Sequence, residues 1–225
     1  MINNTRTLVI PDIHTRIRLA ESIIDYEPHD QIVFLGDYFD GYDDSLEITH
    51  QVAEWLYESM SKPNRIHLLG NHDLSYLNPD YRCSGYSEGK RWAIKNTKLN
   101  LNNLSHYYMI GNILLTHAGL SKEFYDECNY NSRMVGSFLD NMVRTNKTRL
   151  YNCSRVRGGL DSFSGILWCD FEEFVPIDGV RQIFGHTNDK AVRKIGDNYC
   201  IDTFGSSYAV IQNGEIEIKT FKLGG

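Results

Sequence analysis

The sequence predicts an α/β fold, and three observations point to it. Short apolar runs recur along the chain, amphipathic stretches follow several of them, and an Asn-Gly pair separates two strand-like segments near the C-terminus. Continuous apolar runs bounded by Gly, Asp and Asn suit strands that are buried on both faces of an α/β sheet. The expected strands are residues 8–10, 32–35, 66–69, 113–115 and 182–184.

Helices are expected between these runs. The helices predicted by apolar spacing cover residues 16–26, 45–60, 88–96 and 134–145. Near the C-terminus, Asn213-Gly214 stands between residues 208–211 and 215–218, and an Asn-Gly pair is the strongest short signal for a β-hairpin. We therefore expect βα units first and antiparallel strands at the end.

The composition agrees with a single domain spanning residues 1–225, and the cysteine pattern predicts a cytoplasmic location. The net charge is −6 without a long basic block, whereas proteins that track nucleic acid carry a clustered cationic face. Nucleic acid is thus disfavoured as a partner. No apolar run reaches transmembrane length, which argues against a membrane partner. The five dispersed cysteines form no CxxC pair and suit a reducing compartment.

Five polar clusters directly follow apolar runs. In open α/β sheets the ligand site lies beyond the carboxyl ends of the strands, so these clusters can converge on one crevice. Each contains an Asp, Asn or His of the kind that binds hard or borderline divalent cations. A single such motif occurs often by accident, but the ordered set predicts a metal site. The clusters are Asp12-Ile13-His14, Gly36-Asp37-Tyr38-Phe39-Asp40, Gly70-Asn71-His72-Asp73, Thr116-His117-Ala118-Gly119 and Gly185-His186-Thr187.

These motifs, DxH, GDxxD, GNHD, HAG and GH, resemble those of the calcineurin-like metallophosphoesterases. The likeness runs from Asp12 to His186. The last motif contains one histidine, His186, and has Asn188 where other branches of the family carry a second one. This feature and the segment 166–170 (Ile-Leu-Trp-Cys-Asp) resemble the phosphoprotein phosphatase branch and its compact bacterial and bacteriophage members. The segment 70–74 is also similar to symmetrical dinucleoside tetraphosphatases. The resemblance implies a metallophosphoesterase αββα sandwich, in which two mixed β-sheets are flanked by helices.

The resemblance also implies two divalent metal ions bridged by Asp37. The other implied ligands are Asp12 and His14 for the first metal, and Asn71, His117 and His186 for the second. Oxygen and nitrogen ligands without thiolate favour Mn, Fe, Zn or Mg over copper. Manganese is the first choice by resemblance.

The implied activity is hydrolysis of phosphoesters, with a metal-bridging hydroxide as the nucleophile. His72, paired with Asp40, would protonate the leaving oxygen, because an alkoxide leaves phosphate poorly. The first hypothesis is a phosphomonoesterase of the serine/threonine protein phosphatase type, acting on a phosphorylated protein or peptide. The second is a symmetrical dinucleoside polyphosphate hydrolase with a nucleotide substrate. A nuclease or phosphodiesterase is disfavoured, and a non-catalytic scaffold would typically lack His72 or a ligand.

Two features concern substrate binding. Where the resembling protein phosphatases carry a phosphate-binding Arg after the second Asp of GDxxD, this chain has Gly41, and Arg157 or Arg155 is the expected replacement. Residues 75–106 are predicted to be an insertion that helps to form the substrate wall. Its aromatic residues could stack on a base, but packing on one another is the favoured expectation.

Overall fold

The computed structural model of the chain describes residues 5–42, 44–129 and 134–221. Within these residues the strands form two five-stranded mixed sheets, ordered β10-β9-β1-β2-β3 and β4-β5-β6-β8-β7. The first sheet comprises β1 (Thr7–Ile10), β2 (Gln31–Phe34), β3 (Arg65–His67), β9 (Ser207–Gln212) and β10 (Glu215–Thr220). The second comprises β4 (Tyr108–Ile110), β5 (Ile113–Leu115), β6 (Arg181–Phe184), β7 (Arg193–Ile195) and β8 (Asn198–Cys200).

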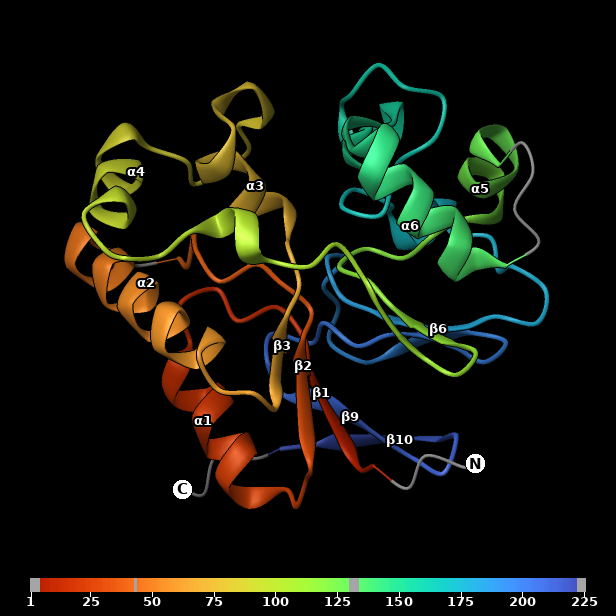
Figure 1. The fold of residues 1–225 in the computed structure, drawn as a ribbon, viewed down its shortest axis with the longest axis horizontal. Helices are drawn as coiled ribbons and strands as arrows, with labels where there is room; N and C mark the ends of the chain where they lie inside the picture. Colours follow the sequence, from red (N-terminus) through yellow and green to blue (C-terminus); the bar gives the residue numbers. More distant parts are fainter. Residues whose placement is uncertain (1–4, 43, 130–133, 222–225) are drawn as a thin grey trace.

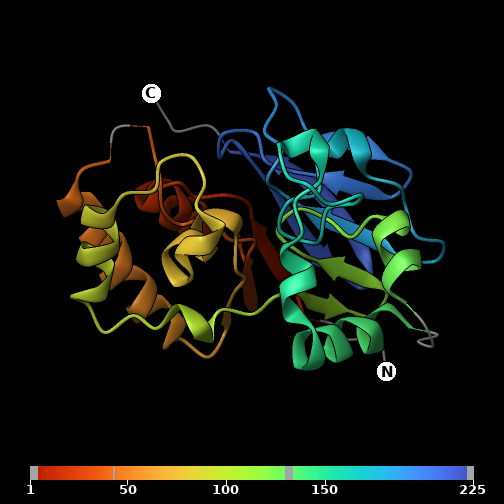
Figure 2. The same ribbon diagram turned by 90° about the horizontal axis from the view of Figure 1, so that it is seen from above.

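The helices lie outside the two sheets (Figure 1). They are α1 (Ile17–Tyr26), α2 (Leu46–Met60), α3 (Asn71–Leu77), α4 (Glu88–Lys95), α5 (Lys122–Cys128) and α6 (Val135–Thr145). Short 3-10 turns cover Pro79–Tyr81, Leu101–Asn103, Lys147–Tyr151, Arg155–Arg157 and Phe171–Glu173. Seen from above, α1 to α4 gather beside the first sheet, whereas α5 and α6 lie over the second (Figure 2). The predicted sandwich is confirmed, and none of the described helices has the length and apolar character needed to cross a membrane.

Successive side chains along the strands point to opposite faces and so belong to two separate layers of the hydrophobic core. In β1, Leu8 and Ile10 belong to the cluster shared with the helices. Val9 between them belongs to a second cluster, which also takes Ile113 of β5 and Ile183 of β6 from the other sheet. Successive side chains of a strand point to opposite faces, so β1, β2 and β9 each contribute one face to the cluster shared with the helices and the other face to the cluster between the sheets. This explains why these runs are apolar throughout.

The C-terminal hairpin has the predicted turn. β9 and β10 pair antiparallel with Gln212 opposite Glu215. Asn213 and Gly214 both adopt left-handed backbone, with φ of 53° and 79°. Two consecutive positive φ values are what a two-residue hairpin loop of matching twist requires, and Asn-Gly adopts them at low cost.

Parallel pairing places the polar clusters at one edge. β1, β2 and β3 pair in parallel, and so do β5 and β6. Their carboxyl ends lie on the same side of the sandwich, where the loops that carry the five clusters begin. The expected convergence therefore follows from strand direction.

Candidate active site

The backbone is unusual where the clusters begin. A positive φ is uncommon for residues other than Gly, and such residues gather at functional sites. The non-glycine residues with positive φ in this region are His14, Thr15, Asp37, Asp40 and His186. The amides of Ile13 and His14 both donate to the carbonyl of Asp37, at 3.1 and 2.8 Å. The first two clusters are thus joined through their backbones before any side chain is considered.

Two glycines let carboxylates approach the backbone. A Cβ at Gly70 would lie 2.1 Å from Oδ1 of Asp37, and a Cβ at Gly185 would lie 1.9 Å from Oδ1 of Asp12. No larger residue fits at either position without moving a carboxylate. Close approach of this kind is a use for which Gly is suited.

Asp73 organises the loops, and the sequence reasoning assigned it no role. Its carboxylate is fully buried and accepts the amides of Asp37, Tyr38 and Gly70, each at 2.9 Å. The bond to Gly70 is the capping-box contact at the start of α3. The spacing of Gly70 and Asp73 could have revealed that local contact, but not the two bonds to the neighbouring loop.

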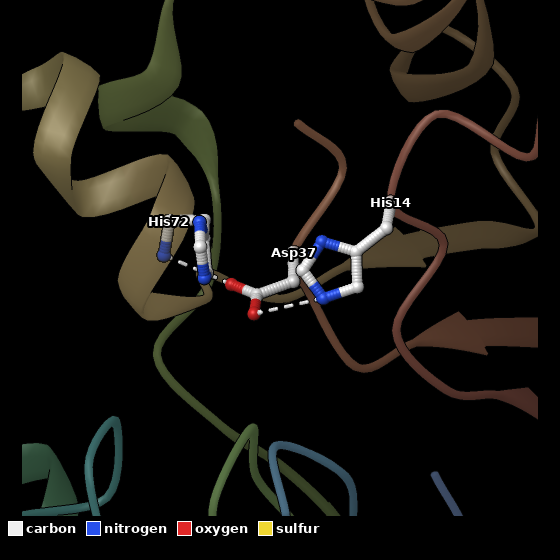
Figure 3. Close-up of side chains that lie close together, drawn as sticks. All are labelled: His14, Asp37 and His72. Atoms are coloured by element: carbon white, nitrogen blue, oxygen red, sulfur yellow. Dashed lines mark hydrogen bonds and ion pairs between the residues drawn. The ribbon is translucent and has the colours of Figure 1, made fainter. Parts of the chain in front are cut away.

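Asp37 lies between His14 and His72 (Figure 3). Its Oδ2 is 3.6 Å from Nε2 of His14 and 3.5 Å from Nε2 of His117. Its Oδ1 accepts the backbone amide of His72 at 3.0 Å. Burial acts to raise the pKa of Asp37, but the surrounding histidines outweigh burial and lower it. Asp37 is therefore an ionised carboxylate with imidazoles on two sides, as a bridging ligand requires.

A second group of donors converges beside Asp37. Oδ1 of Asn71 is 2.8 Å from Nε2 of His117 and 2.9 Å from Nδ1 of His186, and these two ring nitrogens are 3.1 Å apart. Nδ1 of His117 lies 3.0 Å from the carbonyl of Leu35. With its proton donated there, His117 directs the lone pair of Nε2 into the site, as in metal-binding histidines.

Asp12 has a different position from the other implied ligands. Both of its oxygens lie 3.1 Å from the backbone amide of His186. Among the described residues, the close donor groups that include Asp37 are Asp37 with His14 and His72, and Asp37 with His117 and His186. Asp12 is thus adjacent to the donor groups but is not part of them.

The charge distribution fits bound cations. Asp12, Asp37, Asp73 and Asp202 are all buried in this region. Burial raises the pKa of Asp202 to about 8, with the charge of Asp12 adding to the effect, and burial together with Asp37 raises that of Asp73 to about 7. Buried carboxylates this close repel one another unless positive charge is supplied. The donors present therefore suit two divalent metal ions.

His186 supports the same conclusion. Its Nε2 is buried without a hydrogen-bond partner among the described residues. Burial, together with the neighbouring His117 and Arg157, holds the pKa of His186 well below its usual value. His186 is therefore a neutral imidazole, the form that ligates metals.

His72 and Asp40 form the expected pair. Nδ1 of His72 lies 2.9 Å from Oδ2 of Asp40, whose side chain is 1% exposed. Burial would lower the pKa of His72, but the charge of Asp37 and the hydrogen bond to Asp40 outweigh it and raise the pKa. His72 is thus protonated, with Nδ1–H donating to Asp40. The Cys83 thiol completes a further group of close donor atoms with this pair.

Four of the six metal-ligand candidates, His14, Asp37, Asn71 and His186, line a pocket of about 580 Å³. Its wall includes Arg157, Trp168 and Asn188, together with His72. Nε of Arg157 is 2.6 Å from Oδ2 of Asp170, and its Nη2 donates to Thr187 at 3.1 Å. These contacts fix the guanidinium beside the donors.

Arg155, the other arginine expected to bind phosphate, is exposed and does not line this pocket. Only one of the two candidates is therefore brought to the site. Position 41 explains the need for a replacement. A Cβ on Gly41 would lie 2.3 Å from Oγ1 of Thr15 and 2.9 Å from the carbonyl of His14, so an arginine does not fit there without movement.

The three tyrosines of segment 75–106 pack on other aromatic rings of the protein, whereas Trp92 is exposed. Tyr76 stacks on Tyr86 with ring centroids 5.3 Å apart, and Tyr81 packs edge-on against Tyr151. The same segment does reach the pocket, to which it contributes Arg82 and Ser84.

Several solved structures share this fold. A candidate diadenosine tetraphosphatase aligns with a TM-score of 0.52 and 19% identity, over 98% of this chain and 96% of its own. A serine/threonine phosphatase from Saccharomyces cerevisiae aligns with a TM-score of 0.58 and 14% identity, over 99% and 81%. A variant of a cold-active protein tyrosine phosphatase aligns with a TM-score of 0.60 and 16% identity, over 98% and 81%. At such identities the likeness shows the fold alone.

No curated protein sequence matches the chain. The profile of the calcineurin-like phosphoesterases matches residues 5–195, which include all five clusters. Membership of this family agrees with the two-sheet sandwich and with paired donor groups at the carboxyl ends of its strands. The chain belongs to the calcineurin-like phosphoesterase family and is a hydrolase of phosphoester bonds.

Proposed function

We propose that the protein is a phosphomonoesterase of the serine/threonine protein phosphatase type, dependent on two divalent metal ions. The observation that carries this proposal is the protonated His72, 2.9 Å from Asp40 and bonded through its amide to Asp37, next to both donor groups. A structural or scaffolding site has no use for a proton donor held in this position. Mn²⁺ is the proposed metal, with Fe, Zn and Mg as alternatives, because the donors are carboxylate, amide and imidazole.

The residues divide the chemistry among themselves. Two cations in such a site clamp the oxygens of an in-line displacement and lower the pKa of a bound water. The two cations would be held by six side chains: Asp12, His14, Asp37, Asn71, His117 and His186. Arg157 binds phosphate oxygens, because its planar fork is oriented by Asp170 and Thr187. His72 delivers its Nε2 proton to the leaving oxygen, while Nδ1–H remains bonded to Asp40.

The tyrosines of segment 75–106 offer little support for a dinucleotide substrate. A base needs a free aromatic face, but Tyr76 and Tyr86 stack on each other and Tyr81 packs on Tyr151. Trp168 lines the pocket and contacts His186 edge-on, with ring centroids 5.8 Å apart. A symmetrical dinucleoside polyphosphate hydrolase remains the second candidate, because a candidate diadenosine tetraphosphatase shares the fold over 96% of its own length.

We also propose a single catalytic domain, with residues 75–106 as an insertion that forms part of the substrate wall. Arg82 and Ser84 of this segment line the pocket, which supports that role. The cysteines are all free, as expected of a protein from a reducing compartment, and we propose a cytoplasmic location.

Phosphate and nucleotide release by the manganese-loaded protein tests the proposal. A phosphoserine peptide and diadenosine tetraphosphate are offered side by side, with EDTA as the control. We expect EDTA-sensitive phosphate release from the peptide alone. Cleavage of the dinucleotide alone would transfer the assignment to the second candidate. Inactivity toward both, with metals bound, would contradict phosphomonoesterase activity on proteins.

The same assay tests Arg157. Arg157→Ala should raise KM for the peptide by about 10–100-fold, which corresponds to the loss of a charge-assisted hydrogen bond of roughly 1.5–3 kcal/mol. Arg155→Ala is the matched control and should leave KM unchanged, because Arg155 is exposed outside the pocket. Equal effects of the two substitutions would refute the assignment of Arg157.

A further inference from the structure

Asp40 is contacted on both of its oxygens. Oδ2 faces Nδ1 of His72 at 2.9 Å. Oδ1 accepts the Tyr76 hydroxyl and the ammonium of Lys90, the latter at 3.0 Å. Tyr76 lies in α3 and Lys90 in α4, so both additional donors come from the segment 75–106. The carboxylate is 1% exposed, which leaves water little access to replace either donor.

Lys90 is placed more firmly than a surface lysine. Its ammonium lies 3.0 Å from Asp40, 2.8 Å from Oδ1 of Asp44 and 2.9 Å from the carbonyl of Gly85. An ammonium has three N–H donors, and these three acceptors match them in number. The side chain is 12% exposed, so the contact is not one of the freely solvated ion pairs that contribute little.

The loop between α3 and α4 closes directly over Asp40. Gly85 has a φ of +85°, and a Cβ there would lie 2.7 Å from Cβ of Asp40. The aromatic stack of Tyr76 on Tyr86 holds the two ends of this loop together. Segment 75–106 thus contacts Asp40 through Tyr76, Gly85 and Lys90.

We propose that Lys90 and Tyr76 are positioning residues that hold the Asp40–His72 pair in the geometry for proton delivery to the leaving group. The proposal rests on the proposed function. With Oδ1 held by two donors, the Asp40 carboxylate cannot rotate, and Oδ2 stays on Nδ1 of His72. The imidazole is thereby kept at one angle, with Nε2 directed toward the pocket. The segment 75–106 therefore orients His72 through Asp40, in addition to lining the pocket.

Leaving-group dependence tests this role. Lys90→Met and Tyr76→Phe are assayed on phenyl phosphate and on p-nitrophenyl phosphate, whose leaving group hardly needs a proton. Loss of a partner behind a functional residue typically costs about 10–100-fold, so we expect kcat for phenyl phosphate to fall by that factor and kcat for p-nitrophenyl phosphate to fall by less than about threefold. KM and metal content should remain unchanged. Lys95→Met, an exposed lysine of the same helix, is the matched control.

A second readout is independent of turnover. The Nδ1–H proton of His72, identified in histidine-labelled protein by its absence from His72→Asn, reports the bond to Asp40 by NMR. We expect this resonance to shift or broaden in Lys90→Met and to stay in place in Lys95→Met. An unchanged resonance in Lys90→Met, or equal losses of kcat on the two phosphates, overturns the positioning role. An inactive wild-type protein whose resonance still responds to Lys90→Met would overturn the proposed function and leave the positioning contact supported.

Discussion

At the scale of single residues, neighbouring groups of the site have opposite ionisation requirements. Asp37 is charged because histidines surround it, and its pKa is lowered although burial opposes this. His72 is charged because Asp37 and Asp40 flank it, and its pKa is raised although burial again opposes this. His186 is neutral because burial and nearby positive groups lower its pKa. Pairs of groups whose environments shift their pKa values apart mark the acid and ligand roles.

Substitution separates these roles. His72→Asn should retain both metal ions and lose about 10²–10⁴ in kcat on phenyl phosphate, which is the usual contribution of a general acid. Asp37→Asn should lose metal as well, because the neutral amide cannot offset two cations. Metal content by elemental analysis and kcat from phosphate release distinguish the two variants. Near-normal turnover of phenyl phosphate by His72→Asn would show that another group donates the proton.

At the scale of elements, a buried carboxylate ties α1 to the first sheet. Glu27 follows the last residue of α1, and its side chain is 3% exposed. It accepts Arg6 beside β1, the Tyr208 hydroxyl of β9 at 2.7 Å and Lys219 of β10 at 3.0 Å. Burial acts to raise the pKa of Glu27, but these three donors outweigh it and lower the pKa. The helix that follows Asp12 and His14 is therefore fixed to three strands at its far end.

Glu27→Gln should lower the free energy of unfolding at pH 7 by about 2–3 kcal/mol, because it leaves buried donors without their charged partner. A carboxylate with a lowered pKa contributes stability above its unfolded pKa of about 4.5, and this is lost as pH falls through the folded pKa. The difference between wild type and variant should thus shrink below pH 4.5. Urea unfolding at pH 7 and pH 3.5 measures it. Glu217→Gln, whose side chain is 63% exposed, is the control, and an equal loss there would contradict the argument.

At the scale of the whole molecule, the site opposes folding until cations bind. Asp12, Asp37, Asp73 and Asp202 come from four separate segments that folding brings together at the carboxyl ends of the strands. The pKa values of Asp12, Asp73 and Asp202 are raised, chiefly by burial. Two divalent cations would remove this repulsion and link the two sheets through their ligands.

EDTA should therefore lower Tm. A ligand at 100 times its Kd stabilises by about 2.7 kcal/mol, so two sites give about 5 kcal/mol. At roughly 2–4 °C per kcal/mol for a chain of this size, Tm should fall by about 10–20 °C. Differential scanning calorimetry with and without Mn²⁺ measures the shift. Asp37→Asn should show almost none of it, and a full shift in that variant would place the stabilising metal elsewhere.

The same carboxylates set the pH dependence of the metal-free protein. Where the folded pKa of an acid is raised, the folded state binds more protons than the unfolded state, so stability falls as pH rises. Asp73 and Asp202, with pKa values of about 7 and about 8, should make the EDTA-treated protein less stable between pH 4 and 8. The effect of EDTA on Tm should accordingly grow over this range.

Local sequence patterns predicted much of the secondary structure and the family of this protein. Seven described strands (β1, β2, β3, β5, β6, β9 and β10), four helices (α1, α2, α4 and α6) and the Asn213-Gly214 turn were predicted to within one or two residues, because apolar periodicity and turn chemistry are local properties. The short elements β4, β7, β8, α3 and α5 were not predicted. The clusters could be expected to meet because parallel strands place their carboxyl ends at one edge. The family followed from the order of those clusters.

The partners of the site could not be predicted in this way. Lys90 lies fifty positions after Asp40, Asp202 lies far from Asp12, and Asp73 bonds to a loop thirty-six residues earlier. Lys90 and Asp202 belong to no motif, since a lysine in a helix or an aspartate after a strand has the same local signature on any surface. Asp73 does belong to the GNHD motif, but the motif does not reveal its bonds to the neighbouring loop. The sequence likewise could not decide between Arg157 and Arg155, because only the folded structure places one of them at the pocket. Backbone periodicity and motif order depend on neighbouring residues, whereas the charge balance of the site and the orientation of His72 depend on distances that exist only once the two sheets and segment 75–106 have packed.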